Sequence, residues 1–324
     1  MRAVTIVEGE LRWADHPDPV AGDNEIVVGV RAAGINAADL LQRRGFYPAP
    51  PGVPADIPGL EAAGEVVAVG HRVTRFGLGD RVMAVVGGGA QAEMVAIDEH
   101  CALAVPDGLS WEEAGGFPEA FSTAHDALFT QCGLASGDRV LVTAAAGGVG
   151  TAGVQLAARA GAATVVASVR SAEHRPAVRA LGATAAVDPE EALGRGPFDV
   201  ALELVGASSL TGVLENLAIG GRIVVIGVGG GGARADLDLM ALMHRRARIS
   251  ASTLRARSLL DKAAVARGVE AHVLPHLVAG RIRVPVYATF PMDRAADAYD
   301  HFAAGGKLGK IVLLPPGRST ERAA

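Results

Sequence analysis

Residues 138–150 constrain the fold of this chain more than any other stretch. They read Asp-Arg-Val-Leu-Val-Thr-Ala-Ala-Ala-Gly-Gly-Val-Gly. Val140, Leu141 and Val142 form a short apolar run with β-branched residues, which predicts a buried strand. Small residues follow, and then a helix-like segment over residues 149–160. Strand, glycine turn and helix in this order can hold a dinucleotide pyrophosphate, because glycines let the backbone approach and the helix N-terminus offers free N–H donors.

The spacing of this turn differs from the usual dinucleotide motif. It is Ala144-x-x-Gly147-x-x-Gly150, in place of Gly-x-Gly-x-x-Gly. A glycine-rich turn in any α/β domain is the alternative interpretation. A second strand predicted over residues 163–168 favours the dinucleotide site, because such turns belong to βαβ units. The residues predicted to hold the pyrophosphate are Gly147, Gly148, Val149 and Gly150.

The end of the second strand carries a cation about twenty residues past the last glycine. An NAD-type site usually has Asp or Glu at this position, for the ribose hydroxyls. This chain has Arg170 there, followed by Ser171 and His174. A cation in place of an acid predicts a 2′-phosphate and therefore NADPH, with these three residues facing the phosphate. A solvated surface arginine is the alternative for Arg170.

Composition limits the classes of protein. With 324 residues the chain is long enough for two domains. Its net charge of −5 argues against a nucleic-acid partner, which usually needs a basic patch. Two cysteines, Cys101 and Cys132, cannot make a disulfide framework, so the cytoplasm is the expected compartment. No signal peptide is visible, and the most apolar long stretch, residues 140–169, changes periodicity midway, which predicts strand–helix–strand and no membrane span.

The first third of the chain is predicted to be β-rich, and the middle alternates strands with helices. Strand-like runs separated by Gly, Pro and Asp cover residues 3–7, 25–32, 64–69, 81–86 and 92–97. Beyond the glycine turn, strands are predicted at 163–168, 185–187, 198–204, 222–227 and 248–253, and helices at 172–181, 208–217 and 259–279. The alternation is typical of a doubly wound parallel sheet.

These patterns predict an α/β protein of two domains. A partly open β-barrel covers residues 1–118 and is completed by residues 287–324, where a strand–helix–strand pattern over 285–314 rejoins it. The parallel sheet covers residues 119–286. The last residues, 315–324, are expected to form a loose tail.

Several motifs resemble those of a known superfamily. They are Gly59-Leu60-Glu61-x-x-Gly64, Gly79-Asp80-Arg81-Val82, the turn at 144–150, and the run Gly-Lys-Leu-Gly-Lys-Ile-Val-Leu at 306–313. Together they resemble the medium-chain dehydrogenase/reductase superfamily over nearly the whole chain. Segments 34–40, 42–47 and 87–92 resemble its zeta-crystallin-type NADPH:quinone oxidoreductases. The resemblance implies a GroES-like barrel, a Rossmann domain that binds NADPH, and a homodimer built by pairing the edges of two Rossmann sheets.

The same resemblance bears on zinc. The zinc alcohol dehydrogenases of this superfamily carry Cys where this chain has Asn36, and a His-Glu pair where it has Leu60-Glu61. Without Cys and His at those positions the soft ligands of a catalytic zinc are missing. The structural zinc lobe needs four clustered cysteines, whereas this chain has two, far apart. We therefore expect no metal.

Further site residues follow from the resemblance alone. Asn36 and Thr123 would lie near the nicotinamide. Gly227 and the backbone near Leu254 would line the cofactor channel. Lys310 would reach a cofactor phosphate or the nicotinamide ribose, and a surface lysine before the last strand is the alternative for it.

Tyr47 and Asn36 are the candidate catalytic residues for the reduction of a small molecule. Tyr47 could stack on a quinone or hydrogen-bond its oxygen, although it could also only pack beside residues 48–54. A quinone needs little acid catalysis, so reduction of quinones by NADPH is the leading hypothesis. NADPH-dependent reduction of an enone or other activated alkene is the closest alternative, in which a general acid such as Tyr47 matters more. A non-enzymatic NADPH-binding protein is the third.

Overall fold

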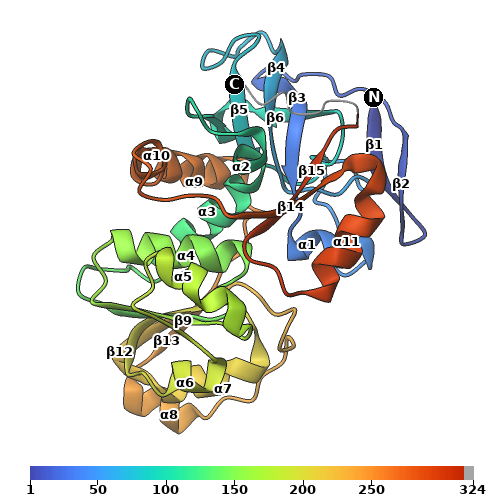
Figure 1. Ribbon diagram of the computed structural model, residues 1–324. Coiled ribbons are helices and arrows are strands. Elements are labelled where there is room, and N and C mark those ends of the chain that lie inside the picture. Colours follow the sequence, from blue (N-terminus) through green and yellow to red (C-terminus); the bar gives the residue numbers. More distant parts are fainter. Residues whose placement is uncertain (317–324) are drawn as a thin grey trace. The chain divides into compact units, whose positions relative to one another are not determined.

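The computed structural model describes residues 1–316 and divides the chain into two compact units (Figure 1). Unit 1 consists of Met1–Glu119, Arg255–Ala279 and the described part of Arg283–Ala324. Unit 2 consists of Ala120–Leu254 and Gly280–Ile282. The predicted tail, residues 315–324, falls mostly outside the described residues.

Unit 2 is built on a sheet of six strands whose neighbours are all parallel. Across the sheet they are β10 (Ala185–Val187), β9 (Thr164–Ser168), β8 (Arg139–Val142), β11 (Phe198–Glu203), β12 (Leu217–Val225) and β13 (Arg248–Ala251). Numbered along the chain from β8, this order is 3-2-1-4-5-6, the doubly wound Rossmann order. The order reverses between β8 and β11, so the loops after these two strands flank the point where such sheets bind ligands.

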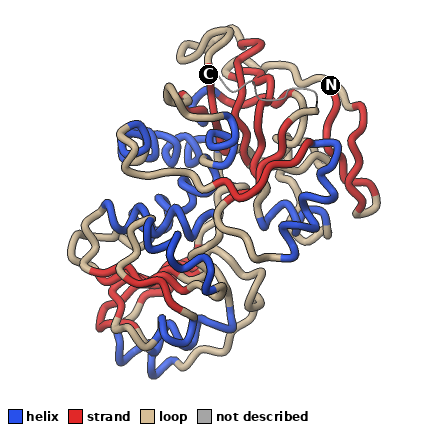
Figure 2. Tube along the Cα trace, in the orientation of Figure 1, coloured by secondary structure: helices blue, strands red, loops and turns tan. Residues whose placement is uncertain are grey.

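Helices cover both faces of this sheet (Figure 1). Helices α4 (Gly148–Arg159) and α5 (Arg175–Ala180) lie on one face, and α6 (Pro189–Leu193), α7 (Ala207–Glu215) and α8 (Leu239–Arg245) lie on the other. The buried core between the layers is apolar and includes Leu141, Val166, Phe198 and Ile223. In Figure 2 the alternation of strand and helix along this unit is visible as red and blue segments. The predicted doubly wound α/β fold is confirmed.

Unit 1 is built on a mostly antiparallel sheet. In order across it are β14 (Val286–Pro291), β15 (Lys310–Leu314), β3 (Glu25–Gly34), β4 (Glu61–Val69), β5 (Arg81–Val85) and β7 (Ala102–Ala104), while β6 (Met94–Asp98) also pairs with β3. Only β14 and β15 are parallel. A separate hairpin joins β1 (Arg2–Val7) to β2 (Glu10–Asp15). Long β3 is the centre of the sheet, because it pairs with three other strands.

Short helices complete unit 1. They are α1 (Ala37–Arg43), α2 (Trp111–Gly116), α9 (Leu259–His272), α10 (Leu274–Val278) and α11 (Ala295–Ala304), with 3-10 turns η1 (Glu99–Cys101) and η4 (Met292–Arg294). Helix α3 (Pro118–His125) and the π-helical turn η2 (Asp126–Gln131) follow α2 along the chain and lie mainly in unit 2. The sequence did not predict β2 or β7, which are short and partly exposed.

The grouping of residues 255–279 differs from the predicted division at 118/119 and 286/287. They pack with unit 1, because α9 contacts η1 and β7 and Arg267 of α9 donates from Nη2 to the Ala102 carbonyl at 2.9 Å. The predicted single helix over 259–279 is two helices. It breaks at Val273, since Pro275 lacks the N–H that would continue the helix.

Candidate active site

Several buried polar groups of unit 1 lie at the N-terminus of α1. Asn36 precedes α1, and its backbone N–H donates to Asp39 Oδ2 at 2.7 Å. The second oxygen of Asp39 accepts from the Gly59 N–H at 3.0 Å. Asp39 is fully buried, and burial raises the pKa of its carboxyl to about 6, against the opposing effect of these two hydrogen bonds. Asp39 therefore links α1 to Gly59, which lies just before β4.

Lys310, Glu61 and Asn36 form a closed cluster beside this helix end. Lys310 Nζ lies 2.6 Å from Glu61 Oε1 and donates to Asn36 Oδ1 at 2.6 Å. Asn36 Nδ2 donates to the same Glu61 oxygen at 2.9 Å. The other Glu61 oxygen accepts from the Glu119 N–H at 2.8 Å. Strands β3, β4 and β15 thus bring together residues that are up to 274 positions apart.

Small residues leave the space for this cluster. A Cβ at Gly34 would lie 2.2 Å from Glu61 Oε1 and 2.8 Å from the Gly115 carbonyl. Glycine at the end of β3 is therefore needed for the carboxylate of Glu61 to lie where it does. Glu61 itself is fully buried and Lys310 is buried as well.

Tyr47 lies in the loop after α1 and is half-buried. Its carbonyl accepts from Arg255 Nη1 at 2.7 Å, and the Arg255 guanidinium lies over its ring, 5.1 Å from the centroid. Burial raises the pKa of the Tyr47 phenol, while the charge of Arg255 lowers it. Tyr47 is therefore held in place through its backbone and its ring, and not only by packing beside residues 48–54.

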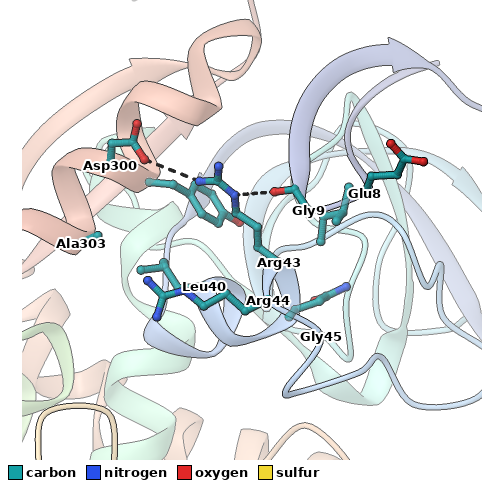
Figure 3. Close-up of a pocket in the computed structure, with 11 residues that line it drawn as sticks. Glu8, Gly9, Leu40, Arg43, Arg44, Gly45, Asp300 and Ala303 are labelled. Atoms are coloured by element: carbon teal, nitrogen blue, oxygen red, sulfur yellow. Dashed lines mark hydrogen bonds and ion pairs between the residues drawn. The ribbon is translucent and has the colours of Figure 1, made fainter.

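A surface pocket of about 840 Å³ opens on unit 1, away from these predicted residues. It is lined by α1, α11 and the turn between β1 and β2, and Arg43 lies at its centre (Figure 3). The Arg43 Nε donates to the Gly9 carbonyl at 2.8 Å, and its Nη1 lies 3.6 Å from Asp300. None of the residues predicted for the site lines this pocket, and no sequence motif predicted it.

In unit 2 the glycine turn has the form a phosphate needs. Gly147 is the N-cap of α4, and no side chain caps this helix end. The first-turn N–H groups are therefore available to an anion. A Cβ at Gly150 would lie 2.6 Å from both the Ala144 carbonyl oxygen and Ala145 Cα, whereas the nearest atom to a Cβ at Gly147 is 3.5 Å away. Gly150 is thus required by packing within the turn, and Gly147 leaves open space above it.

Two side chains that the sequence analysis missed fix the neighbouring loops. Thr143 follows β8, and its Oγ1 accepts from the Leu204 N–H at 2.7 Å. Glu203 ends β11, and its Oε1 accepts from the N–H groups of Val205 and Gly206 at 2.7 and 2.9 Å. Both loops at the switch point are therefore held by side chains from the strands that precede them. Only a strand alignment could have shown that Thr143 lies opposite Leu204.

Arg170, Ser171 and His174 all follow β9, as predicted from the sequence order. The Arg170 side chain is exposed. The Ser171 hydroxyl donates to Glu173 Oε1 at 3.1 Å, and His174 Nε2 lies 3.6 Å from the same oxygen. An acid that the sequence analysis did not consider therefore stands among the three residues predicted to face a 2′-phosphate.

The remaining predicted residues lie in unit 2. Gly227 follows β12, and a Cβ there would lie 2.6 Å from the Leu204 carbonyl. The backbone after β12 therefore passes close to the backbone after β11. Thr123 on α3 and Leu254 after β13 are both buried. Asn36 and Lys310 contact each other directly in unit 1, whereas the glycine turn, Arg170 and Gly227 share the carboxyl edge of the unit 2 sheet.

The described part of the chain offers neither a metal-ligand cluster nor a membrane-spanning helix. In residues 1–316 no group of three or more His, Cys, Asp or Glu side chains is placed to hold a metal ion. No helix in the same range has the length and apolar character needed to cross a membrane. Cys101 and Cys132 are both buried and unbonded, and burial raises the pKa of each thiol to about 11.

The chain matches two family descriptions and several known proteins. Residues 22–130 match the alcohol dehydrogenase GroES-like domain, and residues 148–267 match the family described as zinc-binding dehydrogenase. The second match contains two histidines and no cysteine of this chain. Quinone oxidoreductase-like protein 2 of Mus musculus is 32% identical over 92% of this chain and 86% of its own length.

One relative is much longer, and one similar structure was solved with a cofactor. Polyketide synthase GfsB of Streptomyces halstedii is 34% identical over 94% of this chain, which spans only 5% of that protein. The quinone oxidoreductase of Thermus thermophilus, described alone and in complex with NADPH, superimposes with a TM-score of 0.84 at 34% identity. That match covers 97% of this chain and all of the other.

Proposed function

This chain belongs to the medium-chain dehydrogenase/reductase superfamily, and from that premise we propose that it reduces quinones with NADPH and without zinc. The observation that carries the proposal is the buried cluster of Lys310, Glu61 and Asn36. Where the zinc enzymes of the superfamily carry Cys and His, this chain has the amide Asn36 and the apolar Leu60, and Asn36 donates to the neighbouring carboxylate of Glu61. The cation that they hold is the ammonium group of Lys310.

The donor set of this cluster does not suit zinc. Both oxygens of Glu61 already accept hydrogen bonds, one from Lys310 and Asn36 and one from the Glu119 backbone. Zinc sites in proteins are usually built from Cys sulfur and His nitrogen, with carboxylates as additional ligands. The family description "zinc-binding dehydrogenase" therefore applies to the fold of residues 148–267, and we propose that this chain works without the metal.

The glycine turn fits NADPH. When bound, the cofactor supplies a hydride to the substrate. The N-terminus of α4, over Gly147, Gly148, Val149 and Gly150, would hold the pyrophosphate, because its N–H groups lack a side-chain cap. Arg170 would contact the 2′-phosphate, with Ser171 and His174 beside it. Gly227 and Leu254 would line the rest of the cofactor site, Asn36 and Thr123 would lie near the nicotinamide, and Lys310 would lie near a cofactor phosphate or the nicotinamide ribose.

A quinone suits the groups that unit 1 offers. Addition of a hydride and one proton to a quinone gives a hydroquinone, and that proton can come from water. Lys310 and Glu61 are held in their mutual ion pair, so neither is available as a free acid or base. Quinone reduction suits this site because it needs neither group in that role. Tyr47 would bind the quinone ring by stacking or through its hydroxyl.

Reduction of an enone or other activated alkene is the second candidate. The similarity to a segment of a protein named polyketide synthase supports this second candidate, because that name refers to the synthesis of polyketides. In this reaction the hydride goes to the β-carbon and the α-carbon must be protonated, so Tyr47 would act as general acid. Turnover of neither class would leave the third hypothesis, an NADPH-binding protein without this activity.

The assembly and location are proposals of the same kind. Strand β13 is an edge of the unit 2 sheet, and α8 carries three exposed apolar side chains, Leu239, Met240 and Met243. An unpaired edge beside apolar surface suits pairing with a second copy, so we propose a homodimer. Two unbonded cysteines suit a reducing compartment, and the cytoplasm is proposed on that ground.

The test is NADPH oxidation by the wild type and Tyr47→Phe with a panel of quinones and enones. We expect turnover of quinones, with a mild effect of the substitution on them. If the enone is the true substrate, Tyr47→Phe should slow enone reduction by about a hundredfold or more, because it removes the acid. A large loss confined to quinones would contradict both the stacking role and the acid role of Tyr47. Absence of turnover with the whole panel would overturn the proposed activity.

A further inference from the structure

Arg255 binds three separate segments of unit 1 with one guanidinium group. It is 3% exposed. Its Nε donates to the Gly87 carbonyl at 2.7 Å, Nη1 to the Tyr47 carbonyl at 2.7 Å, and Nη2 to Gln42 Oε1 at 2.6 Å. Gly87 follows β5, Tyr47 follows α1, and Gln42 lies on α1. Arg255 is more than 160 positions away from each of them along the chain and joins all three.

The chemistry of these contacts requires arginine. All three acceptors are uncharged, and burying a cation without a bonded carboxylate is unfavourable unless its donors are satisfied. A planar guanidinium offers its donors in fixed, diverging directions, whereas an ammonium group is a single point. The same plane faces the Tyr47 ring, which adds a cation–π contact. One group thus fixes both the backbone and the ring of Tyr47.

The contacts extend to the ends of the loop that carries Tyr47. Gln42, which accepts from Arg255, also donates from Nε2 to the Ala55 carbonyl at 3.1 Å. The loop is therefore tied at Tyr47 by Arg255 and at Ala55 by Gln42. Gln42 also lines the surface pocket between α1 and α11. On the other side, a Cβ at Gly88 would lie 3.4 Å from Arg255 Nη2, so the segment 87–89 runs directly beside the guanidinium.

We propose that Arg255 is a positioning residue that fixes Tyr47 and the segment 87–89 as one preformed surface for the quinone. This inference rests on the proposed function, in which Tyr47 contacts the substrate. It assigns a common purpose to two sequence motifs, 42–47 and 87–92, that otherwise have no role in binding the cofactor. Arg255 itself sets the affinity for the quinone and does not take part in hydride transfer.

The kinetic test compares Arg255→Met with Arg255→Lys and with a matched control. Arg81 is the control, because it makes the same kinds of contact elsewhere: Nη2 donates to the Leu109 carbonyl at 2.8 Å and the guanidinium lies 4.3 Å from the Trp111 ring centroid. Arg255→Met should raise KM for the quinone by about tenfold or more, as loss of hydrogen bonds from a charged donor predicts. We expect little change in kcat or in NADPH affinity. Arg255→Lys should raise the quinone KM less than Arg255→Met does, and Arg81→Met should leave it unchanged.

A titration that needs no turnover separates failure of this inference from failure of the proposed function. The chain has three tyrosines, so subtracting the spectrum of Tyr47→Phe isolates the Tyr47 phenol. Because the charge of Arg255 lowers the pKa of Tyr47, Arg255→Met should raise it, whereas Arg255→Lys and Arg81→Met should not. If the wild type reduces no quinone, the proposed function fails and the titration alone decides the positioning role. A quinone KM that moves no more in Arg255→Met than in Arg81→Met, or an unmoved Tyr47 titration, would overturn the inference.

Discussion

The ammonium nitrogen of Lys310 lies 2.6 Å from the carboxylate of Glu61, and the two side chains are 4% and 0% exposed. Both belong to unit 1, on β15 and β4. Asn36 completes the cluster, so every charged atom of the pair has a bonded neighbour. A buried ion pair of this kind is stable only while both charges are present.

Loss of one charge should therefore destabilise the fold. Lys310→Met leaves the Glu61 carboxylate buried without its counter-charge, and the free energy of unfolding should fall by about 3–5 kcal/mol. The double variant Lys310→Met with Glu61→Gln removes both charges and should recover most of that loss. Urea unfolding of the three proteins measures it. A loss below about 1 kcal/mol, as for exposed ion pairs, would show that the pair is not buried in solution.

Substitutions in the glycine turn should separate cofactor binding from folding. Gly147→Val should lower NADPH affinity about tenfold or more, which is about 1.4 kcal/mol, because its side chain enters the space above the α4 N-terminus. The protein should still fold, since the nearest atom to the new Cβ is 3.5 Å away. Gly150→Val is the contrast: its Cβ would lie 2.6 Å from backbone atoms, so the folded protein itself should be lost. Calorimetric titration and thermal unfolding distinguish the two, and unchanged NADPH affinity in Gly147→Val would place the phosphates elsewhere.

The stability of unit 1 should respond to the charge on Asp39. Burial raises the pKa of Asp39 to about 6 in the folded protein, from 3.8. The folded state thus binds the proton more tightly than the unfolded state does. The contribution of Asp39 to stability is full below about pH 4 and is lost as the pH rises through about 6, a change of about 3 kcal/mol.

The matched variant is Asp39→Asn, which does not titrate but keeps an oxygen for the Gly59 N–H. Relative to the wild type it should become more stable by about 2 kcal/mol between pH 4 and pH 7, whatever its stability at the starting pH. Urea unfolding at the two pH values gives the difference. A difference that stays constant with pH would mean that Asp39 ionises normally.

Cofactor choice should depend on two opposite charges after β9. Arg170 can grip a 2′-phosphate with parallel hydrogen bonds, which predicts a preference for NADPH over NADH of about tenfold to a hundredfold. Arg170→Asp should shift the preference towards NADH. Glu173→Gln should increase the preference for NADPH, because the carboxylate that engages Ser171 is removed. The measurement is kcat/KM for both cofactors at one ionic strength, and an equal use of NADH by the wild type would contradict the role of Arg170.

Much of the fold could be predicted because its signals are local. The run at Val140–Val142, the glycines after it and the apolar strands that follow specify strand, turn and helix within short windows, and the structure has β8, α4 and β9 there. The place of Pro275 could also have shown the break between α9 and α10. The grouping of α9 with unit 1 could not, since it depends on distant contacts such as Arg267 with Ala102.

The site was predictable only in part for the same reason. Asn36 and Lys310 were each chosen by resemblance, but no spacing shows that they contact each other and Glu61, because β3, β4 and β15 come from opposite ends of the chain. The contacts of Arg255 with Gly87, Tyr47 and Gln42 were not predictable for the same reason, because these residues are far from Arg255 in the sequence. Glu173 was overlooked although it lies between two predicted residues, because a single acid in a polar segment carries no local signal.

The most direct test of the proposed function is quinone reduction by metal-free protein. The purified chain is dialysed against a chelator, its zinc content is measured, and NADPH oxidation is followed with a quinone. With Lys310 holding Glu61 and Asn36 in place of a metal, we predict full turnover when the zinc content is far below one ion per chain. Quinone turnover that disappears with the zinc and returns when one zinc per chain is restored would contradict the proposal.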